Sequence, residues 1–69
     1  MESSLRAGRV VSFDPVKGDG LIAPFGSDEH VPFRAQAIRF VDIVAEGQPV
    51  IYAIERAGVN TQAVEVRPA

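Results

Sequence analysis

Fifteen valine and isoleucine residues against two leucines dominate the apolar part of this chain of 69 residues. β-Branched side chains suit pleated strands better than helices, because helices restrict their χ1 angles. Five prolines and six glycines recur at short intervals. They divide the chain into segments of about five to nine residues, which is the length of strands joined by turns. The chain is therefore predicted to be all-β.

Five strands are expected, over residues 8–14, 20–24, 31–34, 50–55 and 63–66. The most distinct is 50–55, where apolar side chains alternate with a period of two. Residues 35–44 combine helical spacing with β-branched side chains, which predicts one helical turn and a loop. Pro32 has no amide hydrogen, so its strand must lie at an edge or contain a bulge.

Five short strands bury a core only by wrapping into a small antiparallel barrel. An OB-type barrel over residues 7–67 is favoured, an SH3-like barrel is the alternative, and residues 1–6 and 68–69 are expected to be flexible termini. The predicted core consists of the inward-facing apolar residues Val10, Ile22, Val31, Phe33, Val50, Tyr52, Ile54, Val64 and Val66.

Composition and charge exclude several classes of function. A net charge of −2 provides no general basic field, so any contact with nucleic acid must be local. Without cysteine there is no disulfide, thiolate site or thiol nucleophile, and the single His30 is too little for a metal site or a nucleophile dyad. No apolar run is long enough for a membrane helix, and no signal layout is present. We therefore expect a cytoplasmic protein that is not an enzyme and needs no cofactor or metal.

Five short motifs occur in a characteristic order: GRVVSFD (8–14), KGDGLI (17–22), HVPFRAQAI (30–38), EGQPV (46–50) and TQA (61–63). Together they resemble the bacterial cold-shock domain, whose pattern reads G-x-V-K-W-F-N, K-G-F-G-F-I, D-V-F-V-H-x-S-A-I, E-G-Q-x-V and P-Q-A. The resemblance covers about residues 7–67, with a loop after Ile38 that is two residues shorter than usual. It implies an OB-type barrel that binds single-stranded RNA or DNA on the outer face of its first three strands.

The chain departs from the family pattern mainly at its aromatic positions. Ser12 replaces Trp, and Asp19 and Leu21 replace two Phe residues. In the third motif, Pro32 replaces Phe and Arg34 replaces His. Stacking on an aromatic side chain contributes about 1–3 kcal/mol per base, so these losses predict weak binding.

The resemblance implies a nucleic-acid site that comprises Phe13, Lys17, Leu21, Arg34 and Phe40. Phe13 is interpreted as an exposed stacking platform and Lys17 as a phosphate contact. Arg34 either stacks on a base or pairs with Asp14 or Asp19. The sequence leaves open whether Phe40 is exposed, and Phe25 is interpreted as a lid on the barrel.

Two functional hypotheses follow from these residues. In the first, a cold-shock-like protein binds single-stranded RNA or DNA weakly and with strong salt dependence, as a nucleic-acid chaperone or regulator of gene expression, including transcription. In the second, the altered face of the barrel docks a protein partner, because Leu21 and Pro32 contribute to an apolar patch there. We expect a monomer or a weak dimer.

Overall fold

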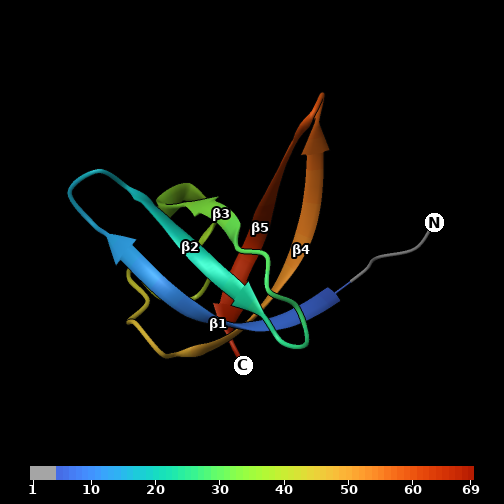
Figure 1. Cartoon of the computed structure of the whole chain (residues 1–69). Helices are drawn as coiled ribbons and strands as arrows, with labels where there is room; N and C mark the ends of the chain where they lie inside the picture. The colour runs from blue at the N-terminus through green and yellow to red at the C-terminus, as the bar shows by residue number, and fades with distance from the viewer. Residues whose placement is uncertain (1–4) are drawn as a thin grey trace.

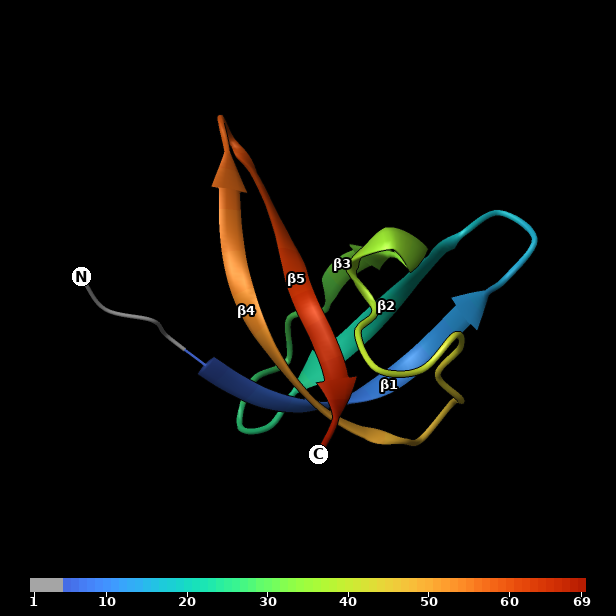
Figure 2. The same cartoon turned by 180° about the vertical axis from the view of Figure 1, so that it is seen from behind.

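The computed structural model of the chain describes residues 5–69, apart from the side chain of Ala57. It contains five strands, β1 (Leu5–Asp14), β2 (Asp19–Pro24), β3 (Val31–Arg34), β4 (Pro49–Ala57) and β5 (Asn60–Pro68), and the short 3₁₀ helix η1 (Ala35–Ala37). The strands close into a barrel in the order β1-β2-β3-β5-β4 (Figures 1 and 2). The predicted all-β class and five-stranded barrel are thus confirmed.

Strand β1 is the longest strand and pairs with two neighbours. Its C-terminal part is antiparallel to β2, and its N-terminal part is antiparallel to β4. β3 pairs with β2 along its length and meets β5 in parallel at one position, Phe33 opposite Ala63. The β4–β5 hairpin projects beyond the rest of the barrel (Figure 1). β3 is thus paired mainly with β2. It lies between β2 and β5 in the closed barrel, so it is not the edge strand that was one of the two expectations for Pro32.

Strand boundaries extend further than the sequence indicates, except in β3. Leu5 and Arg6 lie in β1, and Arg67 and Pro68 lie in β5. Ala69 donates a backbone hydrogen bond to Pro49 at 3.1 Å. β5 therefore reaches Pro68, in the segment for which the sequence predicts a flexible terminus. Of the predicted N-terminal flexible segment, residues 1–6, residues 1–4 lie outside the described residues.

The core contains six of the nine predicted residues, Val10, Ile22, Phe33, Val50, Tyr52 and Val66, together with Ile38, Val44 and Ala63. Val31 and Ile54 are half-buried and pack against this core. Val64, however, lies outside it. Ile38 directly follows η1 and Val44 lies in the loop before β4, so this connection also contributes to the core.

An extra residue in β5 explains why Val64 was wrongly predicted to be buried. Ala53 pairs with Val64 while Ile51 pairs with Arg67, so the single residue Tyr52 faces two residues of β5. Glu65 has a φ of 53° within this bulge. The extra residue shifts the alternation, and Ala63 points into the core in place of Val64.

A second bulge lies in β1. Val10 pairs with Ile22 and Ser12 with Leu21, which leaves Val11 as an unpaired extra residue. Beyond Val11 the two faces of the strand are exchanged relative to strict alternation. As a result, Ser12 faces outward and Phe13 faces the barrel interior.

None of the helical segments within residues 5–69 is long and apolar enough to cross a membrane.

Candidate nucleic-acid interface

Two rows of side chains cross strands β1, β2 and β3 on their outer face. In the first row, Ser12 lies opposite Leu21, and Leu21 lies opposite Pro32. Paired residues of antiparallel strands project to the same face, so these side chains are direct neighbours. Leu21 is 36% exposed at the centre of the row. The middle of the face is therefore small and apolar, with no aromatic ring.

The second row carries the charges of this face. Asp14 lies opposite Asp19, and Asp19 lies opposite Arg34. All three side chains are exposed. The hydrogen bonds found among residues 5–69 include none from the Arg34 guanidinium to Asp14 or Asp19. Arg34 is thus presented to solvent beside two carboxylates, which keeps the local potential close to neutral.

The turn between β1 and β2 places Lys17 at the same end of the face. The Asp14 carboxylate accepts hydrogen bonds from the backbone amides of Val16 and Lys17 at 2.9 and 3.2 Å. Gly18 has a φ of 76° and accepts a hydrogen bond from Ala35, the residue after Arg34, at 2.9 Å. These bonds tie the turn to the end of β3, so Lys17 and Arg34 lie at the same corner of the face as Asp14 and Asp19.

Phe13 does not stand free as the sequence predicts. It is half-buried, and its ring stacks on the buried Phe33 ring with centroids 5.7 Å apart and planes 12° apart. Gly20 lies between them in the register, where a Cβ atom would come within 2.7 Å of the Phe33 ring. The prediction of an exposed platform is corrected, because the Val11 bulge turns Phe13 inward.

Phe40 lies in the loop after η1 and is 85% exposed. Its φ of 74° falls in the left-handed region, which is rare for an aromatic residue. The preceding Arg39 fixes the loop, since its amide donates to Val66 at 2.7 Å and its guanidinium donates to Gln36 at 2.8 Å. The fold thus holds Phe40 in a strained and exposed conformation.

Two shallow grooves next to Arg34 extend the face toward β5. One, of about 170 Å³, is lined by Arg34, Gln36, Arg39 and Gln62, among others. The other, of about 340 Å³, is bordered by Asp19, Arg34 and the polar side chains that begin β5. The sequence analysis left Gln36, Arg39 and Gln62 out of the site, although Gln62 lies in the TQA motif and was a usable signal.

Phe25 is 56% exposed, with the Arg9 guanidinium 5.7 Å above its ring, so the predicted lid on the barrel is wrong. Within residues 5–69 no group of three His, Cys, Asp or Glu side chains is placed to hold a metal ion.

Comparison with known proteins gives a structural match only. No protein-family model matches the chain, and no curated protein sequence matches it. The fold is similar to the solved structure of Drosophila Unr CSD456, whose name denotes cold-shock domains, with a TM-score of 0.81 at 12% sequence identity. The match covers 96% of this chain and 27% of that one. The barrel therefore has the cold-shock OB fold, and the SH3-like alternative is excluded.

Proposed function

We propose that this protein binds single-stranded RNA or DNA, weakly and with strong salt dependence, on the outer face of β1–β3. One observation carries the proposal: in a barrel of the cold-shock type, the turn that contains Lys17 is hydrogen-bonded to the residue that follows Arg34. Guanidinium groups pair with phosphates and stack on bases, so Arg34 serves in both ways.

The proposed path of the nucleic-acid strand runs from the corner that contains Lys17 and Arg34 along the groove beside β5. Arg34 and Arg39 line this groove together with the amide side chains of Gln36 and Gln62. The arginines contact phosphates, and the amides donate to and accept from base edges. Phe40 provides an exposed ring on which a base stacks. We propose further that the protein acts in the cytoplasm and in the regulation of gene expression, which are expectations from the sequence.

Fluorescence anisotropy of labelled single-stranded oligonucleotides tests the proposal. We expect micromolar dissociation constants, and an affinity about tenfold lower at 200 mM than at 50 mM salt if two or three phosphates are neutralised. Arg34→Gln and Lys17→Gln should each weaken binding. Arg67→Gln, on the last strand, serves as the charge-matched control and should change little. Absent or salt-independent binding contradicts the proposal.

A second candidate function rests on the first row of the face. Leu21 and Pro32 are exposed neighbours with Ser12 beside them, and they form a small apolar patch bordered by Asp19 and Arg34. Such a patch suits a protein interface. If the face docks a protein or a second copy of this chain, Leu21→Glu abolishes the association seen by sedimentation or pull-down. Unchanged association excludes this function.

A further inference from the structure

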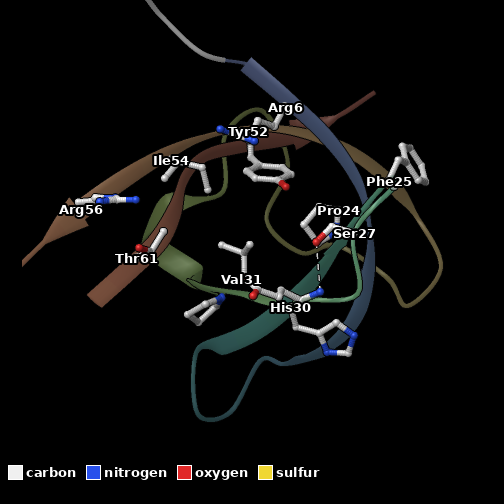
Figure 3. A pocket seen from close by; sticks show the side chains of 13 residues that line it. Arg6, Pro24, Phe25, Ser27, His30, Val31, Tyr52, Ile54, Arg56 and Thr61 are labelled. Carbon is white, nitrogen blue, oxygen red and sulfur yellow. Dashed lines mark hydrogen bonds between the residues drawn. The ribbon is translucent and has the colours of Figure 1, made fainter. Parts of the chain in front are cut away.

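A pocket of about 460 Å³ opens at the end of the barrel, next to Pro32 of the first row. Its lining comes from β1, the end of β2, the β2–β3 turn, the start of β3 and the β4–β5 hairpin. In Figure 3, Val31, Tyr52 and Ile54 surround the open space, whereas Phe25 and His30 point away from it. The volume lies within the range of small-molecule sites in proteins. Apolar walls are contributed by Pro24, Val31 and Ile54, among others.

The strand register brings two arginines to this opening. Arg6 lies opposite the buried Tyr52, so its side chain projects to the barrel-facing side of β1. On β4, Arg56 continues the inward row of Tyr52 and Ile54 and lies opposite Thr61. Arg6 and Arg56 thus stand at the ends of the inward-facing rows of β1 and β4, whose other members are core residues. Both side chains are exposed, so the guanidinium groups are solvated at the opening and available to a ligand from solution.

Tyr52 adds an unpartnered polar group. The residue is fully buried, and its hydroxyl has no hydrogen-bond partner within residues 5–69. In Figure 3 the hydroxyl is directed toward the pocket, but it has almost no exposed area, so a ligand that binds it must displace the side chains that cover it. Buried hydroxyls in native proteins nearly always have a partner, so one without any calls for an explanation. Burial raises the pKa of Tyr52, partly offset by Arg6, so the hydroxyl is a donor at neutral pH.

The charges at the opening favour an anion. Glu29 is the one acidic residue of the described chain that lines the pocket, against Arg6 and Arg56, while His30 lies at the rim. Neither guanidinium donates a hydrogen bond among those found within residues 5–69. The planar fork of arginine matches carboxylate and phosphate oxygens. Donors at the rim and apolar walls below suit an oxyanion with an apolar or aromatic body.

We propose that the mouth of the barrel binds a small organic oxyanion, a carboxylate or a phosphate monoester, held by Arg6, Arg56 and the Tyr52 hydroxyl. The apolar walls contact the body of the ligand. This site adjoins the outer face of β1–β3 at Pro32, and its existence does not depend on nucleic-acid binding.

Amide chemical shifts of the full chain, titrated with benzoate, uridine 5′-monophosphate and inorganic phosphate, test the proposal and separate the two sources of oxyanion. Neutral benzamide and uridine are the matched controls. We expect shifts at Arg6, Tyr52, Arg56 and Thr61, with tighter binding of one organic anion than of inorganic phosphate. Absence of shifts for all three anions up to about 10 mM, equal binding of the neutral controls, or shifts confined to Leu21 and Arg34 would overturn it.

Variants locate the site independently. Loss of one charge-assisted hydrogen bond should weaken binding about tenfold in Arg56→Gln, and Tyr52→Phe should weaken it severalfold while keeping the shape of the ring. Arg67→Gln is the control and should bind as the wild type does. Unchanged affinity in both Arg56→Gln and Tyr52→Phe excludes the proposed contacts.

Discussion

Phe13 on β1 and Phe33 on β3 stack on each other across β2, with ring centroids 5.7 Å apart, and Gly20 fills the position between them. The stack exists because β2 has no side chain at this point of the inner face. It links the three strands that carry the proposed nucleic-acid interface. A change that weakens this stack should therefore also loosen the three strands that form the proposed interface.

Gly20→Ala should destabilise the barrel. An added Cβ would lie 2.5 Å from the Ser12 carbonyl oxygen and 2.7 Å from the Phe33 ring, so either the backbone or the stack must move. We expect a loss of about 1–3 kcal/mol in the free energy of unfolding. Urea unfolding followed by far-UV circular dichroism measures it. Glu46→Ala, at an exposed loop position, is the control and should stay within about 0.5 kcal/mol of the wild type.

Restoring two aromatic residues to the outer face should strengthen binding to single strands. Asp19 and Pro32 are both exposed, so phenylalanine fits at either position without entering the core. Asp19→Phe with Pro32→Phe should raise the affinity more than tenfold, since each stacked base contributes about 1–3 kcal/mol. Anisotropy titration is the measurement, and Asp19→Asn separates the loss of charge from the gain of a ring. No gain in the double variant would show that missing aromatic rings do not limit binding.

Phe40 should show opposite effects on stability and binding. Its φ of 74° is unfavourable for any side chain but open to glycine. Phe40→Gly should therefore raise the free energy of unfolding by about 1 kcal/mol, whereas Phe40→Ala, which keeps the strain, should not. Both variants should bind single strands more weakly, because the exposed ring is gone. A destabilised Phe40→Gly would show that the ring contributes packing in the native barrel.

Tyr52 should make the stability of the protein depend on alkaline pH. Burial raises its pKa above the ordinary value of 10.0, so the folded state binds the phenolic proton more tightly than the unfolded state. The resulting stability is present below the unfolded pKa and is lost as the pH rises through the folded pKa. Unfolding experiments at about pH 8 and about pH 11 should show a larger loss for the wild type than for Tyr52→Phe. Equal losses would exclude this linkage.

Much of the fold follows from local rules that act within each segment. β-Branched alternation and Pro and Gly turns predict where strands occur, and β3 has the predicted bounds. Six core residues were predicted because an apolar residue at the right phase of a strand is buried whichever neighbour it meets. The exposure of Leu21 and Arg34 follows from the same alternation of inward and outward side chains. The inward orientation of Phe13 does not follow from it, because the bulge at Val11 shifts the alternation.

What the sequence by itself determined is therefore the class of the fold, the succession of strand segments along the chain, and the low net charge that limits nucleic-acid binding. Tertiary structure decided the two bulges, at Val11 and Glu65, which turn Phe13 inward and exchange Ala63 for Val64 in the core. It also placed Arg6 and Arg56 together with Tyr52 at the mouth of the barrel. The physical reason is closure: strands must bend and shift register to meet around a barrel, and a shift of one residue exchanges the two faces of a strand.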